Sequence, residues 1–337
     1  MLYGTLRQLL FRLEAERVHD LVSLTTDAVA SLLPPACRRC GVSDRPVELK
    51  GIRFPNRLGL AAGFDKEGRF LRGAQALGFG FTEIGAVTPK PQPGHARPRM
   101  WRYPEQRALR NKMGFNNPGA WALARRLADR PRNFPCGVNL GKNASTPLER
   151  AVDDYLAGLE TLYGHADFFV VNVSSPNTEG LRSLQNELSA LLDPVVRRAA
   201  ELAEQFELGP RPILVKLSPD IDLSLLAPLA ESALRSGVDG FVAANTTSAR
   251  TGVYQTIPAE GGLSGPLLHE NAVKMVELLR KEGGEETVLI GCGGVRDVGT
   301  YQNFLAAGAD LVQLYTGLIY EGPGLIRRIL KGVERDV

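Results

Sequence analysis

The feature of this sequence that most restricts its fold is a regular alternation, after Pro46, of short apolar runs with longer amphipathic segments. Short apolar runs bounded by turn residues are typical of buried parallel strands, and a 3.6-residue apolar period is typical of helices. The expected strands are Leu58–Ala62, Phe81–Gly85, Gly137–Leu140, Phe168–Val173, Ile213–Leu217, Gly240–Ala243, Val288–Gly291 and Leu311–Leu314.

Helical patterns lie between most of these strands. The expected helices are Pro118–Arg130, Pro147–Leu162, Asn186–Gln205, Leu223–Ser236, Glu270–Lys281 and Val298–Ala307. Strands joined by helical crossovers predict an α/β chain folded as a parallel (β/α)8 TIM barrel. A doubly wound sheet is the alternative, but it usually carries a G-x-G-x-x-G turn after its first strand. Here the first strand leads into AAGFDKEG, which favours the barrel.

Residues 1–40 have a different pattern, which predicts a two-helix N-terminal extension. One helical face is formed by Leu2, Leu6, Leu9, Leu10 and Leu13, and a second amphipathic helix reaches Leu32. The extension is either a cap packed on the barrel or a hairpin whose apolar faces meet a membrane surface or an apolar ligand. No apolar segment is long enough to span a membrane, and charged residues interrupt any secretory signal.

Charge and cysteine content exclude other classes of protein. A formal charge of +3 on 337 residues is near balance, so no nucleic-acid partner is expected. Four scattered cysteines do not form a disulfide framework, which favours an intracellular setting. Cys37 and Cys40 form one C-x-x-C, but zinc sites usually need a second ligand pair and none stands nearby. They are interpreted as ordinary thiols, and no metal site is expected.

Polar side chains gather where the expected strands end. Asn139, Asn172, Lys216 and Asn245 all hold such positions. The C-terminal strand ends form the active site of this type of barrel, and burying polar groups there is costly unless a ligand or a network satisfies them. Gly294, in the GCGG that follows the seventh strand, lacks a Cβ and lets the main chain approach a phosphate closely. These strand ends predict a ligand pocket with a phosphate site.

Nine short motifs appear in one order between about residues 46 and 325: AAGFDK, NKMGFNN, VNLGKN, NVSSPNT, VKLSPD, NTT, GGLSG, GCGGV and YTG. Together they resemble the dihydroorotate dehydrogenase family, the flavin enzymes of pyrimidine synthesis. The extension and the serine of NVSSPN resemble the quinone-dependent, membrane-associated class. The soluble class is expected to have cysteine at the position of Ser175 and to lack the extension. This resemblance makes the membrane interpretation of residues 1–40 the leading one.

The resemblance implies a function, a division of the chain and a location. The reaction is oxidation of (S)-dihydroorotate to orotate in UMP biosynthesis, with FMN as hydride acceptor and a membrane quinone as final electron acceptor. Residues 1–40 form the membrane and quinone-tunnel extension, and residues 46–337 form the FMN-binding barrel. The protein is expected peripherally on the cytoplasmic side of the cell membrane. Deleting residues 1–40 is expected to spare dihydroorotate-driven flavin reduction but to remove quinone reduction.

The resemblance also assigns site residues, with Ser175 as the catalytic base. The implied substrate-binding residues are Lys66, Asn111, Lys112, Met113, Gly114, Phe115, Asn172, Asn177, Asn245 and Thr246. The implied FMN-binding residues are Ala62, Gly63, Phe64, Asp65, Lys66, Ala86, Asn139, Asn172, Lys216, Ala244, Gly265, Gly294, Tyr315 and Thr316. Ala86 and Ala244 stand where hydroxyl residues would donate side-chain bonds, so they are assigned as backbone contacts.

These residue types suit the implied reaction. Each asparagine offers both a donor and an acceptor to the amide edges of dihydroorotate, and Lys66 offers a charge-assisted partner to its carboxylate. Ser175 would take a proton from C5 of the substrate while a hydride leaves C6, and it needs activation, for which a water held by Thr178 is a hypothesis. Lys216 would stabilise negative charge on the flavin. Residues 176–184 are expected to form a mobile lid.

Three other functions fit parts of the pattern. A soluble-class acceptor such as fumarate or NAD is disfavoured by Ser175 and by the extension. An aldolase could use Lys216 as a Schiff-base nucleophile. A non-catalytic ligand-binding barrel would keep the pocket without turnover. A yellow protein whose flavin spectrum is bleached by dihydroorotate would separate these alternatives.

Overall fold

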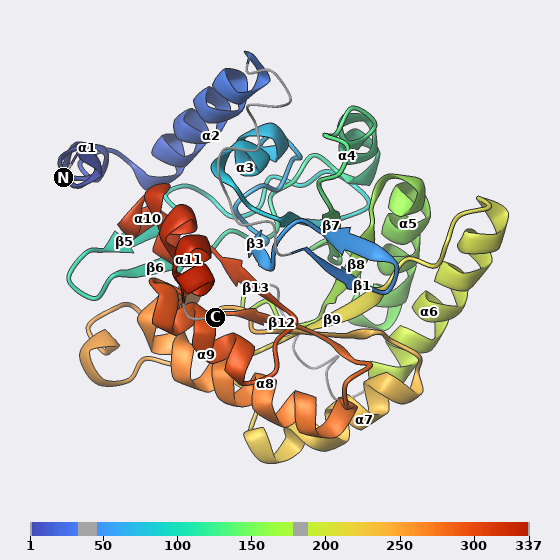
Figure 1. Cartoon of the computed structure of the whole chain (residues 1–337). Coiled ribbons are helices and arrows are strands. Elements are labelled where there is room, and N and C mark those ends of the chain that lie inside the picture. The colour runs from blue at the N-terminus through green and yellow to red at the C-terminus, as the bar shows by residue number, and fades with distance from the viewer. Residues whose placement is uncertain (1, 33–45, 178–187, 336–337) are drawn as a thin grey trace.

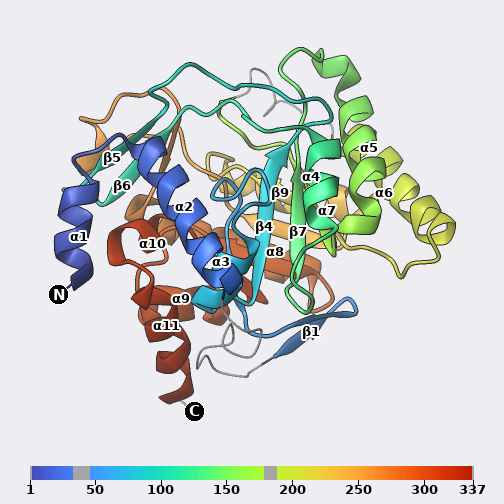
Figure 2. The same cartoon turned by 90° about the horizontal axis from the view of Figure 1, so that it is seen from above.

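The computed structural model describes residues 2–32, 46–177 and 188–335. Its centre is a closed barrel of parallel strands with helices around the outside (Figures 1 and 2). In barrel order the strands are β3 (Leu58–Leu60), β4 (Phe81–Val87), β7 (Cys136–Leu140), β8 (Phe168–Asn172), β9 (Ile213–Leu217), β10 (Gly240–Ala243), β12 (Val288–Cys292) and β13 (Leu311–Leu314). The predicted TIM barrel and its eight expected strands are confirmed.

The helices that cover the barrel follow the strands in the chain. They are α3 (Leu71–Leu77), α4 (Ala120–Leu127), α5 (Ala151–Leu162), α6 (Leu188–Gln205), α7 (Leu226–Arg235), α8 (His269–Gly283), α9 (Val298–Ala306), α10 (Thr316–Glu321) and α11 (Gly324–Arg335). The six predicted helices correspond to α4–α9. Because helices cover the outer face and side chains fill the interior, most of the barrel strands are buried along their whole length.

One end of the barrel is closed by packed aromatic rings. A hairpin of β1 (Val47–Leu49) and β2 (Ile52–Phe54) places Phe54 beneath the barrel interior, with its ring centroid 5.4 Å from that of Phe81 and 6.4 Å from that of Phe168. Val170, Leu214, Val242 and Ile290 belong to the same buried cluster. This hairpin was not among the expected strands. It fills the end at which the strands begin and leaves the opposite end for a site.

A small antiparallel sheet stands beside the C-terminal strand ends. It consists of β5 (Met100–Tyr103), β6 (Ala108–Asn111) and β11 (Gly262–Ser264), in the order β11-β6-β5. β6 pairs with a strand that lies about 150 residues later in the chain, so that Asn111 stands opposite Gly262. The sheet therefore carries the NKMGFNN segment to the mouth of the barrel.

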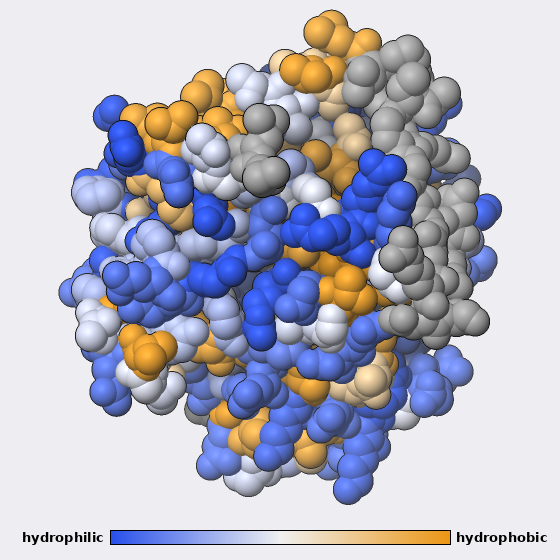
Figure 3. Space-filling model, turned by 60° about the vertical axis from the view of Figure 1, so that its left-hand side comes forward, coloured by the Kyte–Doolittle hydropathy of each residue, from blue (hydrophilic) through white to orange (hydrophobic). Residues whose placement is uncertain are grey.

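The predicted extension is present as two helices, α1 (Leu2–Leu10) and α2 (Ala15–Leu32). α2 packs on α3 at the side of the barrel (Figures 1 and 2). Exposed large apolar side chains gather on α1, on α2 and on the turn between them: Leu6, Leu9, Leu13, Leu21, Val22, Leu24, Val29 and Leu32. Hydrophobic side chains collect along the upper part of the face shown in Figure 3. Within the described residues, every helix is too short or too polar to cross a bilayer.

Candidate active site

One pocket opens at the C-terminal ends of the barrel strands, and most of the predicted site residues line it. We call it the strand-tip pocket. The predicted residues that line it are Ala62, Gly63, Lys66, Ala86, Asn111, Met113, Gly114, Phe115, Asn172, Ser175, Asn177, Lys216, Ala244, Asn245, Thr246, Gly265, Gly294, Tyr315 and Thr316. They come from the ends of β4, β8 and β9, from the segments after β3, β8, β10, β12 and β13, and from the small sheet and the residues next to it, so segments far apart in the sequence meet in one cavity.

Four predicted residues lie outside this lining. Lys112 is directed away and forms an ion pair with Glu260, with 3.0 Å between Nζ and Oε2. Asn139 is fully buried below the pocket. Phe64 and Asp65 line a second cavity between α2 and the barrel, which we call the α2 cleft. The Asp65 carboxylate accepts N–H bonds from its own loop, including one of 2.8 Å from Phe70, and so holds this loop in shape.

The floor of the strand-tip pocket is a buried ionic network that the sequence did not suggest. Glu83 on β4 is fully buried, and its carboxylate lies 3.1 Å from Nζ of Lys216. The same carboxylate accepts bonds of 2.6 Å from the amides of Asn139 and Gln313. Asn139 in turn accepts a 2.9 Å bond from Asn172, which lines the pocket. Glu83 thus neutralises Lys216 and fixes the amides beneath the site.

The signal that could have revealed Glu83 was its position in FTEIGAV. A single carboxylate in an otherwise apolar strand must be paired, because an isolated buried charge is strongly disfavoured. Its pairing with Lys216 also argues against the aldolase alternative. A Schiff-base lysine must present a free amine to a carbonyl, whereas the Lys216 amine is engaged by a buried carboxylate at 3.1 Å.

Amide side chains form the wall of the pocket in two groups, each held together by its own hydrogen bonds. Asn245 donates to the Ser174 hydroxyl at 2.9 Å, and that hydroxyl donates to the Asn172 side chain at 3.0 Å. Across the pocket Asn177 donates to Asn111 at 2.9 Å. The Asn177 side-chain oxygen is buried and has no hydrogen-bond partner among the described residues. An unpaired buried acceptor is unfavourable, so this wall suits a ligand that brings an N–H group.

Ser175 lies beside these amides and is nearly fully buried. Its Oγ accepts the Asn177 N–H at 3.2 Å. The interactions found for the described residues include no histidine or carboxylate bonded to this hydroxyl. Thr178 and most of the proposed lid, like Cys37 and Cys40, lie outside the described residues. The geometry places the Ser175 hydroxyl in the strand-tip pocket.

Lys66 supplies positive charge at the other side of the pocket. Its Nζ donates to the Gly63 carbonyl at 2.8 Å, and the residue lines both the strand-tip pocket and the α2 cleft. Burial lowers the pKa of Lys66 to about 8, with the charge of Glu16 opposing the shift and that of Arg99 adding to it. A bound carboxylate would favour the charged form, so Lys66 is suited to recognise an anion.

The end of the pocket near β12 and β13 is built from small residues and hydroxyls. Gly294 has a φ of +67°, and a Cβ added there would lie 2.8 Å from the Cβ of His269. The hydroxyls of Ser264 and Thr316 lie 2.8 Å apart. Because Gly294 has no side chain, a phosphate can approach its main-chain N–H closely, and the two hydroxyls lie at the same end of the pocket. This arrangement fits the phosphate site expected after the seventh and eighth strands.

Further lining residues were not anticipated, and most are small or apolar. They are Ala61, Met100, Leu109, Ser264, Leu268, Cys292, Val295, Gln313 and Gly317. Gly293, expected beside the phosphate, and Pro176, the first residue of the expected lid, also line the pocket. Such side chains shape a cavity without carrying a chemical signature in the sequence, so a search for polar residues does not find them. Gln313 is the exception, because its amide oxygen is buried and unpaired among the described residues and offers an acceptor to a ligand.

Comparisons with known proteins agree with the motifs. Residues 46–337 match the family model described as dihydroorotate dehydrogenase. The dihydroorotate dehydrogenase (quinone) of Cellvibrio japonicus is 45% identical over 98% of both chains, and that of Acidithiobacillus ferrooxidans is 46% identical over 98% of this chain and 94% of its own. The crystal structure of Eimeria tenella DHODH in complex with ferulenol is 32% identical, covers 96% of this chain and 91% of its own, and has a TM-score of 0.86. The chain therefore belongs to the dihydroorotate dehydrogenase family.

Proposed function

We propose that this protein oxidises (S)-dihydroorotate to orotate in UMP biosynthesis, with FMN bound in the strand-tip pocket and a membrane quinone as final electron acceptor. The relatives named dihydroorotate dehydrogenase (quinone) support the reaction class. The observation that carries the proposal is the pocket wall. Four asparagines, a buried serine hydroxyl and two lysines line one cavity, and the amide oxygens of Asn177 and Gln313 there have no partner among the described residues.

The residues of the pocket fit FMN. Gly265, Gly294 and Thr316 suit its phosphate, because they offer main-chain groups and a hydroxyl at one end of the cavity. Lys216 and the Gln313 amide oxygen, which has no partner in the part of the chain that the structure describes, suit the polar edge of its ring. When bound, FMN supplies the hydride-accepting chemistry that amino-acid side chains lack. Lys216 would stabilise the negative charge that follows the hydride, and Glu83 would hold this lysine in place.

Dihydroorotate fits the opposite wall. Its amide edges can bond to Asn111, Asn172, Asn177 and Asn245, which the structure already brings together. Its carboxylate can pair with the Lys66 ammonium. Ser175 then stands where it can accept the proton from C5 of the substrate.

The function is tested by anaerobic titration of the purified, FMN-loaded protein with dihydroorotate. We expect the flavin absorbance to bleach as orotate forms in equal amount, and to recover when a quinone is added. A protein that does not bind FMN, or a flavin that dihydroorotate leaves oxidised, would refute the proposal. Trapping by borohydride with a carbonyl substrate would instead support the aldolase alternative.

Orotate binding is expected to weaken above pH 8. The pKa of Lys66 is about 8, so the ammonium that pairs with the carboxylate is mostly present at pH 7 and reduced to about one tenth at pH 9. The dissociation constant of orotate should therefore rise by up to about tenfold over this range. In Lys66→Arg the guanidinium stays charged throughout, and the pH dependence should disappear. Equal pH dependence in both proteins would rule out Lys66 as its source.

The extension is proposed to bind the membrane surface and admit the quinone. The exposed apolar side chains of α1 and α2 suit contact with lipid at the bilayer interface. A line of rings leads from α2 to the pocket, because Phe64 packs against His19 at 4.6 Å and against Tyr315 at 5.5 Å between ring centroids. Burial lowers the pKa of His19 to about 4, which keeps this ring neutral at physiological pH. A peripheral position on the cytoplasmic side of the membrane is part of this proposal.

Deletion of residues 1–40 tests the quinone path. At saturating dihydroorotate the truncated protein should still reduce its flavin, because the pocket lining lies within the barrel. Turnover with a quinone should fall to background, since α1 and α2 are gone. Reoxidation by a small soluble oxidant such as ferricyanide serves as the control and should persist. Quinone turnover equal to that of the full chain would show that the extension is not the route.

A further inference from the structure

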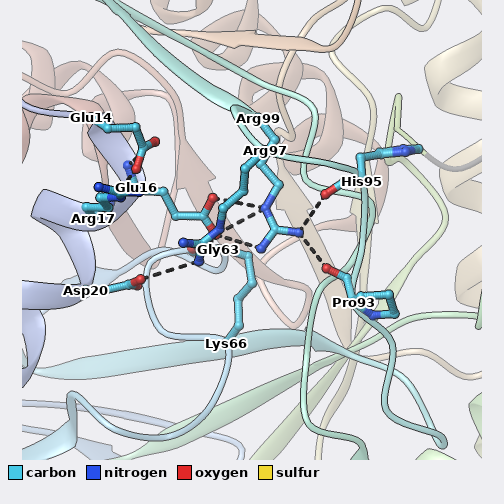
Figure 4. A network of polar contacts seen from close by, with 10 residues as sticks. All are labelled: Glu14, Glu16, Arg17, Asp20, Gly63, Lys66, Pro93, His95, Arg97 and Arg99. Atoms are coloured by element: carbon cyan, nitrogen blue, oxygen red, sulfur yellow. Dashed lines mark hydrogen bonds and ion pairs between the residues drawn. The ribbon is translucent and has the colours of Figure 1, made fainter.

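A buried ion pair fastens the extension to the barrel. Glu16 lies in the first turn of α2 and is almost fully buried, as is Arg99 from the segment before β5. Nε of Arg99 donates to both carboxylate oxygens, at 3.1 and 3.0 Å, and Nη2 donates to Oε1 at 2.7 Å (Figure 4). Forked pairs of this kind are among the strongest hydrogen-bonded contacts, because they fix both distance and orientation.

The remaining nitrogen of the same guanidinium holds a loop of the barrel. Nη1 of Arg99 donates to the carbonyl oxygens of Pro93 and His95, at 2.5 and 2.9 Å (Figure 4). One planar group therefore joins the carboxylate of Glu16 on one side to the loop between β4 and β5 on the other. If Glu16 were removed, the guanidinium would lose the partner that sets its orientation.

This loop supports the segment that we assign to substrate binding. The His95 N–H donates to the carbonyl of Met113 at 3.0 Å, and the Lys112 N–H donates to the carbonyl of Arg99 at 2.8 Å. The His95 ring nitrogen Nε2 lies 3.2 Å from the carbonyl oxygen of Asn177. The loop thus contacts both the residues before Phe115 and the segment that follows Ser175.

Packing adds a second, apolar connection between the extension and this segment. Ala15 at the start of α2 forms a small buried cluster with Met100 and Met113. The His95 ring lies so close to Gly114 that an added Cβ would be 2.7 Å from it. Met113 and Gly114 both line the strand-tip pocket. Displacing the start of α2 therefore removes the packing of Ala15 against Met113 in the pocket wall.

We propose that Glu16 and Arg99 are positioning residues for substrate binding, through which the docked extension holds the substrate segment in its binding conformation. This inference rests on the proposed function. It implies that docking of the extension and binding of the substrate are coupled. A protein whose α2 is displaced binds dihydroorotate and orotate less tightly, although no residue of α2 lines the strand-tip pocket. By reciprocity, bound orotate stabilises the docked position of α2.

Neutralising each member of the pair in turn distinguishes a positioning role from a direct effect of charge on the bound anion. Glu16→Gln removes a negative charge near Lys66, and on charge alone it should strengthen the binding of an anion. Arg99→Gln removes a positive charge and should weaken it. If the pair acts by holding the loop, both substitutions weaken binding. Arg97→Gln is the matched control. Arg97 lies in the same loop and also donates to Oε1 of Glu16, at 3.1 Å, but it is half exposed and its other partner is Asp20, whereas the carbonyls of Pro93 and His95 accept from Arg99.

The test uses the full-length, FMN-loaded proteins and measures two quantities. The first is the dissociation constant of orotate from the change in flavin absorbance, and the second is the rate of flavin reduction at saturating dihydroorotate. We expect Glu16→Gln and Arg99→Gln to raise the dissociation constant by about tenfold, which corresponds to about 1.4 kcal/mol. The saturated rate should stay within about twofold, and Arg97→Gln should change neither quantity by more than about twofold.

The outcomes distinguish this inference from the proposed function. Parent protein that binds no orotate would overturn the function itself. Parent protein that binds orotate, with Glu16→Gln binding it equally or more tightly, would overturn the coupling alone. A loss in Arg97→Gln equal to that in Glu16→Gln would also overturn it, since the bonds of Arg99 to the carbonyls of Pro93 and His95 would then not explain the loss. If Arg99→Gln does not fold, Glu16→Gln and Arg99→Lys decide, because lysine keeps the charge but cannot bond Glu16 and the two loop carbonyls together.

Discussion

Ser175→Ala is expected to slow flavin reduction by dihydroorotate by about 10²- to 10⁴-fold, the range over which a positioned general base contributes to catalysis. The hydroxyl is buried in the pocket beside the amides that would hold the substrate, and alanine removes the only group at that position able to accept a proton. FMN content and orotate affinity should change little, because Ser175 is assigned to the chemistry. Anaerobic stopped-flow absorbance measures the rate directly.

Ser218→Ala is the matched control for this experiment. Ser218 follows β9 and, like Ser175, is buried. Its Oγ accepts the N–H of Asp220 at 3.2 Å, just as the Oγ of Ser175 accepts the N–H of Asn177 at 3.2 Å. It does not line the strand-tip pocket. We expect its flavin reduction rate to match that of the parent. A Ser175→Ala protein that reduces its flavin at the parent rate, or an equal loss in Ser218→Ala, would remove Ser175 from the role of base.

Glu83→Gln is expected to lower the free energy of unfolding by about 3–5 kcal/mol, as is usual when one partner of a buried ion pair is removed. The Glu83 carboxylate accepts bonds from Lys216, Asn139 and Gln313, and an amide would turn an N–H group toward one of these donors. The substitution also leaves Lys216 as a buried cation without a counter-charge. Urea denaturation in the presence of excess FMN measures the change.

The double variant Glu83→Gln with Lys216→Gln provides the control for this prediction. Because it removes both charges together, it should be less destabilised than Glu83→Gln alone, and the two effects should be far from additive. It should nevertheless lose flavin reduction, since the cation assigned to the flavin edge is absent. Equal stability of Glu83→Gln and the parent would show that the ionic floor is not what holds this pocket together.

The barrel was predictable because its signal is local. Each buried parallel strand reads as a short apolar run, and each crossover helix has its own period, so Ile213–Leu217, Gly240–Ala243 and Leu311–Leu314 were expected with the boundaries that the structure shows. The β1–β2 hairpin and the small sheet were missed. β6 and β11 pair over about 150 residues, and β11 has only three residues, so neither strand carries a pattern of its own.

The polar residues of the pocket were also predictable, but their connections were not. Asn172 and Lys216 stand at strand ends, where the topology of a barrel brings such residues together. Glu83 lies inside a strand, and its partner Lys216 is 133 residues away, so the pairing depends on barrel closure. The contact of Glu16 with Arg99 depends on where α2 docks, which no local pattern records.

The crystal structure of the protein with FMN and orotate tests the central claim most directly. The account predicts a flavin in the strand-tip pocket with its phosphate at Gly294 and Thr316, and an orotate ring held by the four asparagines with C5 facing the Ser175 hydroxyl. The ammonium of Lys216 should lie at the flavin and remain paired with Glu83. Orotate bound elsewhere, or a Ser175 hydroxyl directed away from the ring, would contradict the account.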